Sequence, residues 1–335
     1  MNIGVCGSGT IASWVSDILN QLNDERIVLY GVASAFEEQL KTFAAKYGYK
    51  KTYTSYEAMM ADPDIDVIYV AIPNHLHMEV TMKAIEAGKN VIVEKPFAVN
   101  YAQAQKMIGA AKEKGVFITE ALWPSFLPSR KIIDDIIASG KIGEVTGGKL
   151  ISVNNVMFLE RVKKLETGGG ALLDMGPYVL GRMTNHFGWD IKGVTGHFEK
   201  LDTGVDSRDY YTVEYNNGVK VECVSTIDSP EEEREEYGEI CGTKGSIWFN
   251  VISNPDVIEV RDLDGNVIEK PELPKLIQNT EIPFVRGYEH EWLGFEKAIR
   301  EGKQQTDEAP WAQTLAISKV MTELRAQAGV VFPFE

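Results

Sequence analysis

Residues 2–12 read NIGVCGSGTIA, an apolar run that passes into the pattern GxGxxA. The run Asn2–Cys6 is typical of a buried strand, and the apolar spacing over Ile11–Asn23 predicts a helix. In this context Gly7 permits a tight turn, Gly9 lets the backbone approach a pyrophosphate, and Ala12 allows close helix–strand packing. The stretch therefore predicts a dinucleotide site at the N-terminus of a helix, where free N–H groups favour anions. The expected contacts are Gly7, Ser8, Gly9, Thr10 and Ile11.

The same alternation of strand and helix continues to about residue 120. Apolar strands are predicted at Ile27–Ala33, Val67–Ala71, Asn90–Val93 and Val116–Thr119. Helices are predicted at Phe36–Tyr47, Tyr56–Ala61, His77–Ala87 and Tyr101–Lys114. Five β/α alternations predict an α/β fold with an N-terminal Rossmann domain, a doubly wound parallel sheet, over residues 1–121.

Residues 122–335 have a different pattern, with more short strands and tight turns. Asn217-Gly218 between two apolar runs is a strong hairpin signal. Strands are predicted at Lys149–Phe158, Tyr210–Tyr215, Val219–Thr226, Ile247–Val251 and Val257–Val260, and helices at Ser129–Ser139, Ala171–Phe187, Glu289–Arg300 and Trp311–Ala328. The charge run Pro230–Glu236 is expected to be a solvated loop. We expect a C-terminal α+β domain with a large, open, mostly antiparallel sheet. This domain is expected to bind substrate and to form the oligomer. Whether its last helix packs back on the first domain is left open.

Composition excludes several classes of protein. The chain has 34 basic and 49 acidic side chains and a net charge of −15, which argues against nucleic acid or an anionic membrane as partner. No apolar run reaches the ~18 residues of a membrane helix, and no secretory signal is recognisable. Three widely spaced cysteines fit a reducing compartment, so a cytoplasmic protein is expected.

The sequence predicts no metal site. His75 and His77 form an HxH without further ligands nearby. Asp62, Asp64 and Asp66 resemble the start of a calcium loop, but the glycine and glutamate that such a loop needs are absent.

The end of the second predicted strand bears on the choice of cofactor. An acidic residue there would bind a ribose 2′-hydroxyl and an arginine a 2′-phosphate, but the chain has the neutral Ser34. Glu37 and Glu38 are expected on the following helix. We therefore expect NADP or NAD, with a weak preference for NADP.

Three further motifs complete a resemblance to a known family. They are AIPNHLH at 71–77, GKNVIVEKP at 88–96 and GGGALLDMGPY at 168–178. Together with GxGxxA, they resemble the Gfo/Idh/MocA oxidoreductases over nearly the whole chain. The resemblance implies a nicotinamide cofactor whose pocket includes Ser34, Ile72, Pro73, Asn74, His77, Glu94, Lys95 and Trp123.

Tyr178 occupies a position that is histidine in the polyol dehydrogenase branches. In this respect the chain is similar to dimeric dihydrodiol dehydrogenases and certain xylose dehydrogenases. The segments Glu120–Trp123 and Phe126–Pro128 also resemble the dihydrodiol dehydrogenase pattern. It departs from that pattern at Ser125, where an arginine is usual, and at Ala35, where the family commonly has arginine.

Lys95 follows a predicted strand and should emerge at the sheet edge where ligands bind. Its ammonium could stabilise a developing oxyanion or exchange a proton, and the Tyr178 hydroxyl is a second acid/base candidate. Pro96 restricts the backbone of Lys95, and the peptide bond between them is a candidate for the cis form. Asp174, four residues before Tyr178, would share a helix face with it and could hold a substrate hydroxyl or orient the tyrosine. The alternatives are a surface lysine, a core tyrosine and a helix-capping aspartate.

These residues predict an NAD(P)-dependent oxidoreductase that transfers a hydride between nicotinamide and a hydroxyl or carbonyl of a sugar-like or cyclic diol or polyol. A catalytically silent NAD(P)-binding sensor or regulatory protein is the alternative, and an amine-directed or biliverdin-reductase-like enzyme is a second. The resemblance implies a homodimer or homotetramer formed through the second-domain sheet.

Overall fold

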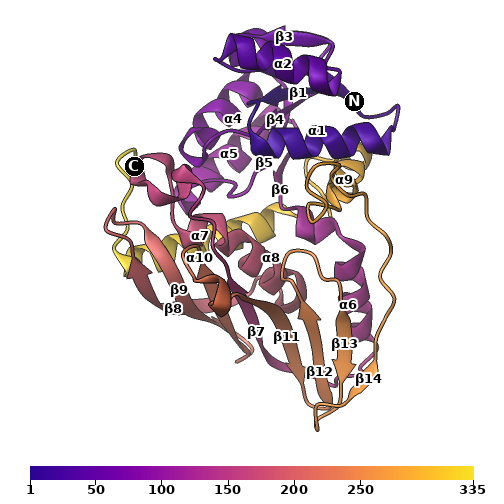
Figure 1. Cartoon of the computed structure of the whole chain (residues 1–335), viewed down its shortest axis with the longest axis vertical. Helices are drawn as coiled ribbons and strands as arrows, with labels where there is room; N and C mark the ends of the chain where they lie inside the picture. Colours follow the sequence, from indigo (N-terminus) through magenta and orange to yellow (C-terminus); the bar gives the residue numbers. More distant parts are fainter. The chain divides into compact units, whose positions relative to one another are not determined.

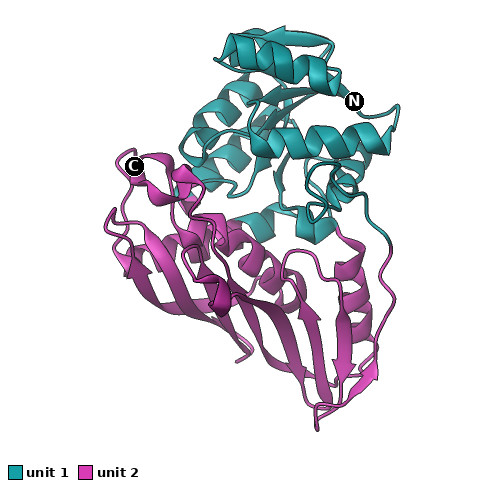
Figure 2. Cartoon of the chain, viewed as in Figure 1, with its two compact units in different colours: residues 1–98, 102–126, 275–314 teal, residues 99–101, 127–274, 315–335 magenta.

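The computed structural model describes residues 1–335, which divide into two compact units (Figure 2). Unit 1 contains residues 1–98, 102–126 and 275–314, and unit 2 contains residues 99–101, 127–274 and 315–335. The chain passes from unit 1 to unit 2 after Phe126, close to the domain boundary expected at residue 121. Residues 275–314, which were expected in the second domain, belong to unit 1. Helical periodicity shows that a segment has an apolar face without showing which sheet will cover it.

Unit 1 is built on a six-stranded parallel sheet with strand order β3-β2-β1-β4-β5-β6 (Figure 1). The strands are β1 (Asn2–Cys6), β2 (Val28–Ala33), β3 (Lys51–Tyr53), β4 (Val67–Val70), β5 (Asn90–Glu94) and β6 (Ile118–Ala121). This order confirms the doubly wound sheet. Strand β3 was not predicted because it has three residues, two of them exposed, and β6 begins two residues later than expected.

Helices cover both faces of this sheet. They are α1 (Thr10–Leu22), α2 (Glu37–Tyr47), α3 (Tyr56–Met60), α4 (His77–Glu86), α5 (Tyr101–Lys114) and α9 (Tyr288–Arg300), with 3-10 turns η1 (Asn74–Leu76) and η2 (Trp123–Phe126). Helix α1 packs against α2 and α9, whereas α3 packs against α4. Strand β4 is buried along its whole length between these layers.

Unit 2 contains an eight-stranded sheet in the order β14-β13-β12-β11-β7-β10-β9-β8. The strands are β7 (Val145–Val153), β8 (Ile191–Lys200), β9 (Asp206–Tyr215), β10 (Lys220–Thr226), β11 (Glu235–Gly242), β12 (Gly245–Asn250), β13 (Ile258–Arg261) and β14 (Val267–Glu269). Only β7 and β10 pair in parallel, so the mostly antiparallel sheet is confirmed. The Asn217-Gly218 hairpin joins β9 to β10, with Gly218 at φ 87°.

The helices of unit 2 are α6 (Pro128–Ala138), α7 (Ala171–Asp174) and α8 (Gly176–Phe187), with three 3-10 turns, η3 (Glu160–Lys163), η4 (Leu165–Thr167) and η5 (Glu231–Glu233). Helix α10 (Trp311–Ala328) starts in unit 1 and belongs to unit 2 from Leu315 onward. Helices α7 and α8 pack on β7, β9 and β10.

Three predictions in this half were wrong in detail. The strand expected at Lys149–Phe158 is β7, which begins and ends earlier, because residues from Asn154 onward fold into turns that pack on the glycine motif. The expected continuous helix Ala171–Phe187 is interrupted at Met175. Pro177 causes the break, since it has no N–H to continue the ladder and fits the first turn of a new helix. The run Pro230–Glu236 enters β11 at Glu235.

Candidate active site

The glycine turn after β1 has the geometry that a dinucleotide phosphate requires. Gly7 adopts φ +103°, and a Cβ atom there would lie 2.4 Å from the Ala71 carbonyl oxygen. Gly9 begins α1 without any side-chain cap, and no acidic residue occupies the first turn of the helix. A Cβ on Gly9 would meet nothing within 4 Å. The start of α1 therefore has no side-chain cap and has open space beside Gly9, an arrangement that favours an anion.

A hollow of about 660 Å³ adjoins this turn. Its lining residues come from the glycine turn, from α1 and from α2, and they are Ser8, Gly9, Thr10, Ser13, Glu38, Gln39, Thr42, Phe43, Lys46 and Tyr47. Of the predicted cofactor contacts, Ser8, Gly9 and Thr10 line it. The turn and hollow suit the phosphate part of a bound dinucleotide.

The other cofactor candidates of unit 1 lie at the carboxyl ends of its strands. Ser34 follows β2; Ile72, Pro73 and Asn74 follow β4; Glu94 ends β5; Lys95 comes next; and Trp123 follows β6. Because the strands are parallel, these positions share one edge of the sheet, which is where ligands bind in open α/β folds.

His77, buried at the start of α4, connects two of these strand ends. Its Nδ1 lies 2.9 Å from the Pro96 carbonyl oxygen and its Nε2 lies 2.9 Å from the Ile72 carbonyl oxygen. Burial lowers the pKa of His77 to about 4, so at neutral pH one ring nitrogen donates a hydrogen bond. The imidazole therefore donates to one of these two carbonyl oxygens and contacts the other, and it lies between the loop after β4 and the turn that carries Lys95.

Lys95 is held at the end of β5 by its neighbours. The Lys95 amide donates to Glu94 Oε2 at 3.2 Å, and the Lys95–Pro96 peptide bond is cis, as the sequence suggested. Glu94 Oε1 accepts a hydrogen bond from the hydroxyl of Tyr69 on β4. The Lys95 side chain is half-buried, so it is shielded on one side while part of it stays accessible.

Trp123 is largely buried against α9. Its indole stacks on Tyr288, with ring centroids 4.9 Å apart and an interplanar angle of 24°. Sequence reasoning missed α9 as part of this region, since nothing in the local pattern of Tyr288–Arg300 indicates which sheet it covers. A contribution of Trp123 to cofactor binding stays a prediction.

Asp174 and Tyr178 belong to unit 2, on either side of the break between α7 and α8. Asp174 is buried and forms an ion pair with Arg161 Nη2 at 2.9 Å, while Tyr178 is half-buried. The argument that both share a face of one regular helix fails because the helix restarts at Gly176. Arg161, on η3, was not predicted, because a single arginine in a polar loop gives no signal of its own.

The triple glycine positions α7. Gly170 has φ +118°, and a Cβ there would lie 2.3 Å from Asp206 Oδ1. The amide of Leu172 donates to Asp206 Oδ2 at 2.7 Å. This bond satisfies an N–H group in the first turn of α7, a role in which a side-chain oxygen stabilises a helix start. Asp206 therefore supports the short helix that carries Asp174.

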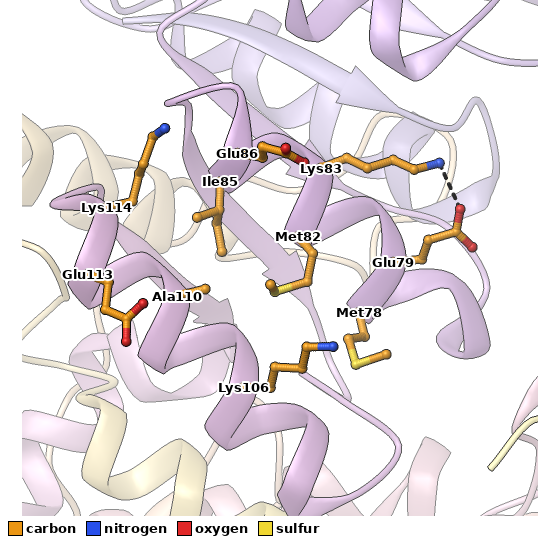
Figure 3. Close-up of a pocket in the computed structure, with 10 residues that line it drawn as sticks. All are labelled: Met78, Glu79, Met82, Lys83, Ile85, Glu86, Lys106, Ala110, Glu113 and Lys114. Carbon is orange, nitrogen blue, oxygen red and sulfur yellow. Dashed lines mark hydrogen bonds and ion pairs between the residues drawn. The ribbon is translucent and has the colours of Figure 1, made fainter.

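A second hollow, of about 760 Å³, lies between α4 and α5 on the surface of unit 1 (Figure 3). Methionines form its floor and charged side chains its rim, and it contains none of the predicted site residues. No group of three or more His, Cys, Asp or Glu side chains is arranged to hold a metal ion. None of the helices combines the length and apolar character needed to cross a bilayer.

The fold and the glycine turn are those of a dinucleotide-binding Rossmann domain, and comparison with known proteins identifies the chain as an oxidoreductase. Residues 1–122 match the model of the oxidoreductase family with NAD-binding Rossmann fold, and residues 131–248 match the GFO/IDH/MocA C-terminal domain. The chain belongs to the GFO/IDH/MocA oxidoreductase family.

Relatives with assigned activities match over the full length. Trans-1,2-dihydrobenzene-1,2-diol dehydrogenase of Xenopus laevis is 30% identical, over 98% of this chain and 98% of that protein. The protein of that name from Mus musculus is 26% identical, over 98% and 97%.

Solved structures share the fold. A levoglucosan dehydrogenase in complex with NADH and L-sorbose has a TM-score of 0.85 at 22% identity, covering 98% of this chain and 96% of that one. KijD10, a 3-ketoreductase from Actinomadura kijaniata in complex with NADP and TDP-benzene, has a TM-score of 0.84 at 23% identity, covering 97% of each chain.

Proposed function

We propose that this protein is an NAD(P)-dependent dehydrogenase or reductase that interconverts a hydroxyl and a carbonyl on a sugar-like or cyclic diol or polyol. The observation that carries the proposal is the placement of Lys95 at the end of β5, on the sheet edge that also presents the uncapped N-terminus of α1. Relatives named for a cyclic diol, for levoglucosan and for a 3-ketoreductase support the substrate class.

The bound nicotinamide would supply the hydride acceptor or donor. Lys95 would then stabilise the negative charge that develops on the substrate oxygen, and Lys95 or Tyr178 would exchange its proton. Asp174, which pairs with Arg161, would accept a hydrogen bond from a substrate hydroxyl.

The weak preference for NADP rests on the end of β2. Ser34 accepts a hydrogen bond from the Phe36 amide at 3.4 Å, and no carboxylate occupies the strand end. Glu37 and Glu38 lie in the first turn of α2, and Lys41 pairs with them at 2.9 and 3.5 Å. This pairing reduces the charge that would repel a 2′-phosphate.

Fluorescence titration with NADPH and with NADH, followed by a turnover screen on sugars and cyclic diols, tests the function. Binding with turnover supports it. Binding without turnover on any substrate favours the silent sensor, and absence of binding removes the proposal altogether.

We also propose a homodimer or homotetramer in the cytoplasm. All three cysteines are unpaired, as expected in a reducing compartment. Half-buried apolar side chains that align across β10 and β7 on one face of the unit 2 sheet support the association.

A further inference from the structure

Three buried glutamates and one buried tyrosine surround the turn that carries Lys95. We call Glu94 of β5, Glu120 of β6, Glu291 of α9 and Tyr69 of β4 the carboxyl cluster. Each is at most 6% exposed. All four belong to unit 1, together with Lys95. Ionisable side chains are rarely buried at this density without a role in positioning or proton handling.

Two members of the cluster hold the backbone on either side of the Lys95–Pro96 bond. Glu94 accepts the Lys95 amide at 3.2 Å, and Glu120 Oε1 accepts the Phe97 amide at 3.1 Å. Glu120 Oε2 also accepts the hydroxyl of Thr314, from the first turns of α10, at 3.1 Å. The turn is therefore fixed by carboxyl groups at both of its ends.

The cluster holds more acid than the nearby cation can balance. Burial, and then the charge of Glu94, raise the pKa of Glu291 well above its usual range. Neither carboxyl oxygen of Glu291 has a hydrogen-bond partner, and a protonated carboxyl tolerates such a site far better than a charged one. Burial likewise keeps the Tyr69 hydroxyl protonated by raising its pKa well above normal, so it remains the donor to Glu94.

Glu120 differs from Glu291 because hydrogen bonds and a nearby cation oppose the effect of its burial. Burial raises the pKa of Glu120 to about 7, with a further upward contribution from Glu94. The hydrogen bonds from Phe97 and Thr314 and the charge of Lys95 act in the lowering direction. The charged groups that act on Glu120 are therefore Glu94 and Lys95, while Glu94 also acts on Glu291 and on Tyr69.

We propose that Glu120 is a positioning residue for Lys95, which it serves both by holding the Phe97 amide and by placing a negative charge that favours the Lys95 ammonium. This inference rests on the proposed function, in which Lys95 acts as a cation. Glu120 gains its charge as pH rises through about 7. The protein should therefore show kcat/KM rising through neutral pH, with a fall at higher pH where Lys95 loses its proton.

Glu120→Gln tests the charge while keeping the shape. A glutamine oxygen can still accept the Phe97 amide, so a residue with only a structural role should leave the pH profile unchanged. We expect the rise near neutral pH to disappear and the alkaline fall to move to lower pH by about one unit. Glu289→Gln is the matched control, because Glu289 is a buried carboxyl on α9 that accepts a hydrogen bond from the Ile277 amide. The pH profile of this variant should match that of the unaltered protein.

Thr314→Val supplies a second variant that leaves the acid in place. It removes the hydroxyl that donates to Glu120 Oε2. Because that hydrogen bond favours the carboxylate, its loss should move the rise in kcat/KM to higher pH. A profile that does not move in either Glu120→Gln or Thr314→Val overturns the proposal.

A readout without substrate separates this inference from the proposed function. The pH dependence of reductive methylation at Lys95, followed by peptide mass spectrometry, reports the fraction of unprotonated amine. We expect its midpoint to fall in Glu120→Gln and to stay unchanged in Glu289→Gln. If the midpoint falls in Glu120→Gln but the unaltered protein shows no turnover, the link between Glu120 and Lys95 stands and the proposed function fails. If turnover is present and the midpoint does not move, the link fails and the proposed function stands.

Discussion

At the scale of single residues, Lys95 is held by the backbone on both sides while its side chain stays partly accessible. Carboxyl groups accept the Lys95 and Phe97 amides, and His77 contacts the Pro96 carbonyl oxygen. Such contacts limit the orientations of the side chain, and a preorganised cation costs little reorganisation when charge develops on a substrate. Loss of the ammonium should therefore affect the chemical step more than cofactor binding.

Lys95→Met should lower kcat by about 10²–10⁴-fold. Methionine keeps much of the apolar stem and removes the charge and the proton. Steady-state kinetics with the best substrate from the screen measure the loss, and fluorescence titration should show a nucleotide Kd within about threefold of the unaltered protein. Unchanged turnover in this variant would exclude Lys95 from the mechanism.

Ser34→Asp should change the cofactor preference. A carboxylate at the end of β2 can accept the ribose 2′-hydroxyl of NAD and repels a 2′-phosphate. We expect the ratio of the NADPH Kd to the NADH Kd to rise at least about tenfold, equivalent to about 1.4 kcal/mol. Ser34→Asn, which has similar size and no charge, is the control; an equal change in both variants would show that charge is not responsible.

At the scale of elements, β9 places two aspartates behind the triple glycine. Asp206 and Asp209 are both buried, and Asp206 accepts the Leu172 amide. Burial, and then the charge of Asp206, raise the pKa of Asp209 well above its usual range. Neither carboxyl oxygen of Asp209 has a hydrogen-bond partner, and a protonated carboxyl tolerates such a site better than a charged one.

The effect of Asp209→Asn on folding stability, relative to the unaltered protein, should become more favourable as pH rises. The folded state holds the proton of Asp209 above the pH at which the unfolded chain releases it, near a pKa of about 3.9. Folding stability from this group is therefore present at low pH and is lost as pH rises toward the folded pKa. Asparagine does not titrate, so the free energy of unfolding of the variant, relative to that of the unaltered protein, should increase as pH rises above about 4.

Urea unfolding at several pH values measures this difference. Asp228→Asn is a control, because Asp228 is partly exposed and pairs with Arg208 instead of another carboxyl. A difference in stability between Asp209→Asn and the unaltered protein that does not change with pH would contradict a protonated Asp209 in the folded protein.

Local sequence signals were sufficient to predict most helices and strands and insufficient to predict a few. Helix α5 and helix α10 have the predicted bounds, since their periodicity and ends are local properties. Strand β8 was missed because its sequence, IKGVTGHFEK, is polar and rich in glycine. There, pairing with β9 decides the structure over the propensity of the residues.

At the scale of the whole molecule, the unit 2 sheet has one face covered by α7 and α8 and another face that is partly apolar. On that second face Tyr210, Val224, Ile151 and Tyr237 are aligned across β9, β10, β7 and β11 by the strand register. All four are half-buried or exposed in the single chain. A row of apolar side chains across four strands is typical of a surface that another protein covers.

Ile151→Asp should disrupt the proposed oligomer. A carboxylate at the centre of a buried apolar interface would lose hydration without gaining a partner. By analytical ultracentrifugation we expect the unaltered protein to sediment as a dimer or tetramer and the variant to shift toward the 37.3 kDa monomer. Gln105→Asp, on the exposed side of α5, should not change the oligomeric state. A monomer in the unaltered protein would remove the proposal.

The sequence by itself determined the parallel sheet, the glycine turn, the position of Lys95 after β5 and the family. Each of these depends on residues close together in the chain, such as Gly7 with Gly9 or Glu94 with Lys95. Only the tertiary structure decided that residues 275–314 join unit 1, that Arg161 pairs with Asp174, and that Glu120 meets Thr314, a residue 194 positions away. Chain folding brings such groups together without any local pattern, and burial then changes their pKa values, because desolvation depends on every neighbour that excludes water.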